Sequence, residues 1–216
     1  MSGAGPRILV TSFEPFGGSP VNPTMRIAEL LRGAPSQGAS LSFATLPVVT
    51  GTADGSAWSA LLPLIERNRP AAVVSLGESA KAERINLERV AVNLRDARIA
   101  DNTGVQLRDL PVVEGAPDAY FATLPVRAML EACASAGVAA ELSLSAGAFL
   151  CNETMFRTLH HAAARRLPLR AGFIHVPQLP EQAAARGGPS MDADTAARGV
   201  RAALEALAFA CAETAA

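Results

Sequence analysis

The sequence is poor in cysteine, histidine and charged residues. Its 216 residues include three cysteines, Cys133, Cys151 and Cys211, at wide and irregular spacing. Because the chain has no CxxC pair and no cysteine and histidine cluster at metal-ligand spacing, we expect no bound metal and a reducing compartment, the cytoplasm. Charged residues make up 18% of the chain, the formal net charge is −1, and lysine and arginine are scattered. We therefore expect no nucleic-acid partner.

Long hydrophobic runs are also missing. The most apolar late segment, residues 200–212, is interrupted by Arg201 and Glu205, which predicts a packed helix and no membrane span. The first seven residues lack the charged and apolar regions of a signal peptide, so we expect no secretion signal. Neither a GxGxxG turn nor a P-loop follows a predicted strand, and no cofactor is implied.

Half of the residues are hydrophobic, and they occur in short segments whose periodicity alternates between strand and helix. The pattern predicts strands near 7–11, 41–45, 71–76, 84–94, 140–145 and 172–176, and helices around 27–30, 58–65, 120–136, 153–167 and 194–213. This alternation predicts a mostly parallel twisted sheet in a three-layer α/β/α sandwich. We expect one α/β catalytic domain over residues 1–216. The polar segment 97–117 is a long loop, a candidate lid or oligomer contact.

A lone cysteine lies between a predicted strand and a predicted helix. Residues 145–152 read SAGAFLCN, so Cys151 is expected near the positive end of the helix dipole, which favours the ionised thiolate. The alternative is a buried, unreactive thiol that packs like a small hydrophobic residue. The carboxyl ends of parallel strands meet at one rim, where ligands bind, so a partner for the thiol is sought at other strand ends.

His175 is the histidine best placed at that rim. It interrupts the apolar segment 172–177 just before a proline, whereas His160 and His161 are adjacent on a predicted helix and are interpreted as surface residues. A cysteine protease needs a thiolate, an imidazole that moves the proton, and an acceptor that fixes the imidazole tautomer.

Glu88 is the most attractive acceptor. It lies inside the apolar segment 85–93, where a charge without a partner would be costly to bury. The alternative for Glu88 is a salt bridge with Arg89 or Arg98. Asp101 and Asn102 are the other candidates for this third role.

Several segments, taken in order, resemble the pyroglutamyl peptidase I family of cysteine exopeptidases, also called pyrrolidone carboxyl peptidases. The resemblance rests on five stretches: FEPFGG at 13–18 with Asn22 and Pro23, ERVAVN at 88–93 with RIADNTG at 98–104, SAGAFLCN at 145–152, GFIHVP at 172–177, and Glu181 with Gln182. It covers the chain from Ile8 to about Gln182 and implies an α/β/α sandwich, in agreement with the periodicity.

The resemblance implies a role for each candidate catalytic residue. Cys151 would be the nucleophile, His175 the general base and then acid, and Glu88 the group that orients the imidazole. Arg98 would lie near the catalytic centre, in reach of the oxyanion. The implied reaction is hydrolysis of the amide bond after an N-terminal L-pyroglutamyl residue through a thioester. Since the family is often tetrameric, a homo-oligomer is expected.

A pyroglutamyl ring is small and uncharged, so its pocket needs apolar walls and a few hydrogen bonds. Phe13, Phe16 and Phe149 would supply walls, although core packing is their alternative role. By resemblance, Val48 would lie nearby and backbone groups around residues 77–79 would bind the lactam.

Glu78 departs from the family pattern, which has glutamine there. A carboxylate could weaken lactam binding, point away from the ring, or favour another substituent. Two alternative functions therefore stay open: a homologue that binds pyroglutamyl peptides with little or no turnover, and a cysteine hydrolase of another cyclic amide.

Overall fold

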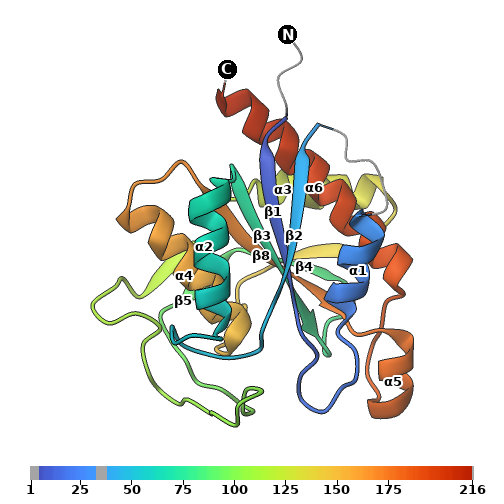
Figure 1. Ribbon diagram of the computed structural model, residues 1–216. Helices are drawn as coiled ribbons and strands as arrows, with labels where there is room; N and C mark the ends of the chain where they lie inside the picture. The colour runs from blue at the N-terminus through green and yellow to red at the C-terminus, as the bar shows by residue number, and fades with distance from the viewer. Residues whose placement is uncertain (1–4, 33–37, 216) are drawn as a thin grey trace.

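The protein is built around one large β-sheet (Figure 1). The computed structural model describes residues 5–32 and 38–215, so residues 1–4 of the segment considered for a secretion signal lie outside the described part. The sheet order is β2-β1-β3-β8-β4-β7, and β5 and β6 form a separate antiparallel pair. The strands are β1 (Arg7–Phe13), β2 (Ser40–Leu46), β3 (Ala72–Ser79), β4 (Ile85–Glu88), β5 (Val90–Val92), β6 (Ala119–Phe121), β7 (Ala140–Ser143) and β8 (Arg170–Pro177). The helices are α1 (Pro23–Arg32), α2 (Ala57–Asn68), α3 (Val126–Ser135), α4 (Leu150–Ala164), α5 (Pro180–Arg186) and α6 (Ala193–Ala215).

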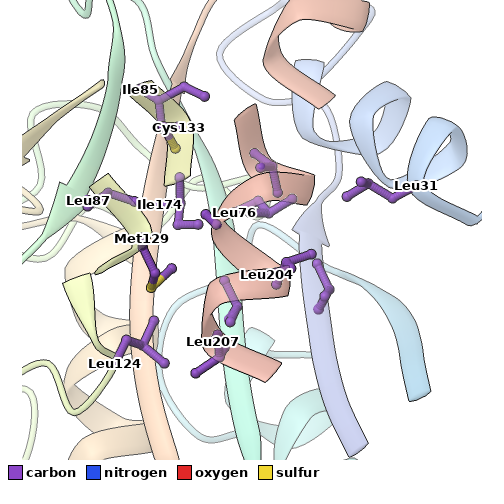
Figure 2. Close-up of a cluster of buried hydrophobic side chains, with 14 of the residues drawn as sticks. Leu31, Leu76, Ile85, Leu87, Leu124, Met129, Cys133, Ile174, Leu204 and Leu207 are labelled. Atoms are coloured by element: carbon purple, nitrogen blue, oxygen red, sulfur yellow. The ribbon is translucent and has the colours of Figure 1, made fainter. Parts of the chain in front are cut away.

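The strands direct alternate side chains into two hydrophobic clusters, one on each face of the sheet. Ile8 packs with α1, α3 and α6, whereas its neighbour Leu9 packs with α2 and α4. This alternation follows from the two-residue period of a strand. Figure 2 shows the first cluster, where Leu204 and Leu207 of α6 lie close to Leu76 of β3. The predicted α/β fold, with a mostly parallel sheet flanked by helices, is confirmed.

Two strands run against the others. β2, β1, β3 and β8 are parallel, while β4 pairs antiparallel with β8 and parallel with β7. The expectation that the residues after every strand meet at one rim is therefore wrong for β7. The segment 144–149 leads from that edge strand to α4, which packs on the face shared with α2. Cys151 reaches the site through this crossing.

Several predicted boundaries are wrong. The helix predicted at 120–136 is shorter, because residues 119–121 form β6 and Pro125 is the N-cap of α3. Proline disfavours helical backbone in the residue before it, so the helix cannot continue back through that position. α4 begins at Leu150, ahead of the predicted start, which puts Cys151 in its first turn. The short helix α5 is absent from the sequence predictions.

The interpretation of both helical histidines as surface residues is wrong for His161. Its side chain is buried, with its ring 5.8 Å from that of Trp58 on α2, because α2 covers this side of α4. Burial, helped by the charge of Arg165, lowers the pKa of His161. His160 is half-buried and shares a 2.9 Å hydrogen bond with the hydroxyl of Tyr120. Neither histidine faces the thiol of Cys151.

The described residues include no helix long and apolar enough to cross a membrane. The same residues contain no group of three or more histidine, cysteine, aspartate or glutamate side chains placed to hold a metal ion.

Candidate active site

Cys151, His175 and Glu88 come together from three elements. β4 and β8 are antiparallel neighbours, and the Nδ1 atom of His175 lies 2.8 Å from Oε1 of Glu88. The thiol of Cys151, in the first turn of α4, interacts with the same imidazole. Glu88 is 1% exposed and His175 7% exposed, so the contact between them is shielded from water. Within the described part of the chain, Glu88 forms no salt bridge with Arg89 or Arg98.

The surroundings of His175 favour its charged form. Burial alone would lower the pKa of the imidazole, but the charge of Cys151 and the Glu88 carboxylate outweigh it and raise that pKa. With Glu88 accepting from Nδ1, the other ring nitrogen is left for the thiol. The arrangement therefore stabilises an imidazolium, the charged partner that a cysteine nucleophile needs at its side.

Two buried polar residues after Cys151 fix the start of α4. The amide of Asn152 donates to the carbonyl of Val92 at 2.8 Å and to that of Leu94 at 3.0 Å, and it accepts from the N–H of Val92 at 2.8 Å. The carboxylate of Glu153 accepts from the N–H of Gly51 at 3.0 Å. These anchors were missed by sequence reasoning, although two polar residues at the buried start of a helix are a usable signal.

A small cavity opens beside the thiol. It is lined by Phe13, Phe16, Asn22, Val48, Gly77, Glu78, Phe149, Leu150 and Cys151. Five of the six predicted substrate-binding residues are in this set, and Asn22 and Leu150 are additions that the structure reveals. Gly77 belongs to the segment 77–79, whose backbone was expected to bind the lactam.

Arg98 is the predicted substrate-binding residue that the structure does not bring to the cavity. Its side chain is exposed, and it forms no hydrogen bond or ion pair with the described residues. The reason is local geometry: Arg95 and Ala97 turn inward toward Glu153, which leaves Arg98 pointing outward. Arg95 instead approaches the first turn of α4, where its Nη1 atom lies 4.0 Å from Oε1 of Glu153.

Asp101 and Asn102, the other candidates for the third catalytic role, hold the loop 97–117 in place. Asp101 accepts a 2.9 Å hydrogen bond from the N–H of Thr50, and the Asn102 amide donates to the carbonyl of Pro15 at 3.0 Å. Burial opposes ionisation of Asp101, but hydrogen bonds from Thr50 and from its own loop lower its pKa overall. The loop is thereby fastened to segments on either side of the cavity.

The backbone of Gly77 lies next to the thiol. It pairs with His175 across β3 and β8, and a Cβ atom at this position would lie 2.5 Å from the Phe173 ring and 3.0 Å from the sulfur of Cys151. The Phe173 ring has little room to retreat, because its centroid is 6.3 Å from that of Phe13 and 4.8 Å from that of His175. Only glycine leaves space for the thiol here.

The carboxylate of Glu78 is directed toward α5. One oxygen is paired with the guanidinium of Arg186, and the other accepts from the amide of Gln182 at 3.1 Å. Of the alternatives open from the sequence, the geometry supports the one in which the charge points away from the ring.

A thiol, an imidazole and a carboxylate that interact in this order beside an apolar cavity define the class of cysteine hydrolases. The family model for pyroglutamyl peptidase matches residues 6–209. The chain belongs to the pyroglutamyl peptidase family, and the resemblance read from its motifs is confirmed.

The similar proteins cover nearly the whole chain. The pyrrolidone-carboxylate peptidase of Gloeobacter violaceus is 46% identical over 202 residues, which is 93% of this chain and 96% of that protein. The crystal structure of pyroglutamyl peptidase I from Bacillus amyloliquefaciens is 31% identical, with a TM-score of 0.90 over 94% of this chain and 95% of the other. A mutant pyrrolidone carboxyl peptidase from Pyrococcus furiosus is 39% identical, with a TM-score of 0.88 over 94% and 99%.

Proposed function

We propose that Cys151, His175 and Glu88 carry out the reaction of the family, which is hydrolysis of the amide bond after an N-terminal pyroglutamyl residue. The observation that carries the proposal is the single imidazole of His175, which is hydrogen-bonded to Glu88 and also interacts with the thiol of Cys151. No metal or other cofactor takes part in the proposed steps.

The reaction proceeds in two halves. The Cys151 thiolate attacks the pyroglutamyl carbonyl, and the carbon–sulfur bond forms as the carbonyl oxygen takes the negative charge. His175 gives its proton to the leaving nitrogen, so the carbon–nitrogen bond breaks and a thioester remains. A water molecule then gives a proton to His175 and attacks the thioester, which releases pyroglutamate and regenerates the thiolate. Glu88 keeps the imidazole oriented in both halves.

The start of α4 supplies donors for the oxyanion. Its N-cap, Phe149, makes no side-chain hydrogen bond to the first turn. The first N–H groups of a helix have no intrahelical partner, and their dipoles stabilise negative charge. We assign this role to the backbone of Leu150 and Cys151.

The cavity suits a neutral lactam. The side chains of Phe13, Phe16, Val48 and Phe149 provide apolar walls. β1 pairs with β3 only as far as Ser75, so the edge of β3 beyond that residue is open toward the cavity. Its backbone groups are the proposed partners of the lactam N–H and carbonyl.

The function is tested by release of a fluorophore from a pyroglutamyl amide, with freshly reduced protein. We expect release, and we expect iodoacetamide to inactivate the enzyme at rates that persist well below about pH 8, since a thiolate reacts where an ordinary thiol does not. Lactam binding without release would instead favour the non-catalytic homologue. Release only from amides of other ring systems would favour the hydrolase of another cyclic amide.

Glu88→Gln is expected to lower kcat by about 100-fold, the scale of a lost general acid–base contribution. Because Glu88 helps to raise the pKa of His175, the substitution lowers that pKa and the imidazolium is lost at a lower pH. The alkaline limb of the kcat profile should therefore move to lower pH. The matched control is Glu141→Gln, on the half-exposed Glu141 of β7, which should leave the profile unchanged. An unshifted alkaline limb in Glu88→Gln would contradict the assigned role.

We also propose that the protein acts as a homo-oligomer. Phe121 and Leu144 are 70% and 71% exposed. They lie at one edge, because Phe121 pairs with Val90 and the adjacent Arg89 donates to the carbonyl of Ser143 at 2.8 Å. Large exposed apolar side chains that share an edge favour contact with a second copy.

Sedimentation should give a mass above that of one chain and a lower mass for Phe121→Asp. A monomer at micromolar concentration would refute it.

The remaining proposals concern organisation and location. The two hydrophobic clusters share one sheet, which supports one catalytic domain over residues 1–216. All three cysteines are free, as expected for a protein that works in the reducing cytoplasm.

A further inference from the structure

Glu78 places a charge next to the cavity that is proposed to bind a neutral ring. The residue lines that cavity, yet its side chain is only 2% exposed. A buried carboxylate is tolerated only when partners compensate the loss of water. Both of its partners, Arg186 and Gln182, come from α5, the short helix at the lower right of Figure 1.

Gln182 is fully engaged in this position. Its carbonyl oxygen accepts from the N–H of Leu179 at 2.8 Å, which fixes the side chain at the start of α5. Its amide donates to Glu78 and also to the hydroxyl of Ser19 at 3.0 Å and the carbonyl of Val21 at 3.3 Å. The segment 14–22, which carries Phe16 and Asn22 to the cavity, is thus tied to the end of β3 through one side chain.

The position of Arg186 is fixed by a second hydrogen bond. Its Nε atom donates to the side-chain oxygen of Gln178, which is fully buried directly after β8. The amide of Gln178 in turn donates to the carbonyls of Gly187 at 2.7 Å and Pro189 at 3.0 Å. The guanidinium is therefore directed toward Glu78 by a network that begins directly after the strand of His175.

We propose that Arg186, with Gln182, is a specificity-determining positioning residue that keeps the Glu78 carboxylate out of the lactam cavity. This inference rests on the proposed function. Without the guanidinium, the cavity is the open space next to the buried carboxylate of Glu78. A carboxylate that turned into it would occupy the place of the uncharged ring. Catalysis itself would be spared, because Arg186 contacts neither Cys151 nor His175.

The test compares three variants in the pyroglutamyl amide assay. Arg186→Met should raise KM by about tenfold or more, as expected when one partner of a buried pair is removed, while kcat stays within about threefold. Glu78→Gln alone provides the reference KM, because it removes the charge and leaves Arg186 in place. The double variant should return KM to within about threefold of that of Glu78→Gln, because no charge is left to move. Inhibition by 2-pyrrolidone, a free five-membered lactam, should weaken in Arg186→Met and recover in the double variant.

Arg26→Met is the matched control, since it removes an arginine from the exposed Arg26 and Glu29 pair on α1, and it should leave KM unchanged. An unchanged KM in Arg186→Met, or no recovery in the double variant, would overturn the proposal. A fall in kcat as large as the rise in KM in every variant would also overturn it, because such a result would show general damage to the enzyme. If Arg186→Met does not fold, then a double variant that folds with near-normal KM supports the charge as the cause. Failure of the wild type to release the fluorophore would instead reject the proposed function.

Discussion

Cys151→Ala is expected to lower kcat/KM by about 10,000-fold or more, the scale seen when a catalytic nucleophile is removed. No thioester can form without the sulfur. Cys151→Ser should also lose most turnover, because a hydroxyl is not ionised by the imidazole as readily as a thiol. The measurement is fluorophore release from a pyroglutamyl amide, with binding of 2-pyrrolidone checked separately to show that the pocket is intact.

The matched control is Cys211→Ala. Cys211 is buried on the opposite face of the sheet, where burial raises the pKa of its thiol, and Cys133 is buried there with its thiol pKa raised to about 11. Neither should react with iodoacetamide in the folded protein at neutral pH. Peptide mapping should therefore find the label on Cys151 alone. Turnover retained in Cys151→Ala, or lost in Cys211→Ala, would reject the assignment of the nucleophile.

Gly77→Ala should cost about 100-fold in kcat/KM, the loss expected when reacting groups are displaced by roughly 1 Å. The added methyl group would sit 2.5 Å from the Phe173 ring and 3.0 Å from the sulfur of Cys151. Because Phe173 packs against both Phe13 and His175, any shift that relieves the overlap moves a cavity wall or the imidazole. Steady-state kinetics and a crystal structure of the variant would both report the displacement.

Gly172→Ala provides the comparison, since Gly172 lies in the neighbouring strand β8 and is equally crowded. There the added methyl group meets the end of the Leu124 side chain at 2.6 Å, away from the site. We expect a loss of about 1 to 3 kcal/mol in the free energy of unfolding from overpacking, with KM and kcat nearly unchanged. If both glycine variants lost activity to the same degree, crowding near the thiol would not be the cause.

The fold was largely predictable because each strand and helix carries its own periodicity. The strand at residues 71–76 is apolar on both faces, and β3 is indeed buried at the centre of the sheet. The reversed direction of β4 and β7 could not be predicted, since pairing direction depends on contacts between distant segments. The helix predicted at 120–136 begins later than expected, at Val126, because Pro125 outweighs the surrounding helical pattern.

The site was predictable only where a residue conflicts with its local surroundings. Glu88 and His175 interrupt apolar strands, and this conflict indicates a function for each of them. In the structure, Nδ1 of His175 lies 2.8 Å from Oε1 of Glu88. Gly77 gives no such signal, because its role depends on a sulfur that lies far along the chain. Arg186 belongs to the unpredicted helix α5, so its pairing with Glu78 depends entirely on tertiary structure.

The antiparallel pairing of β4 with β8 has a consequence for how activity is acquired during folding. Glu88 and His175 are 87 positions apart in the chain, and their contact requires that every element between them has been placed. Closing such a long loop costs entropy that only the finished sheet repays. A partly folded chain therefore has no aligned imidazole and cannot cleave peptides. Recovery of turnover during refolding should coincide with the final assembly step, and it should lag behind the return of helical signal.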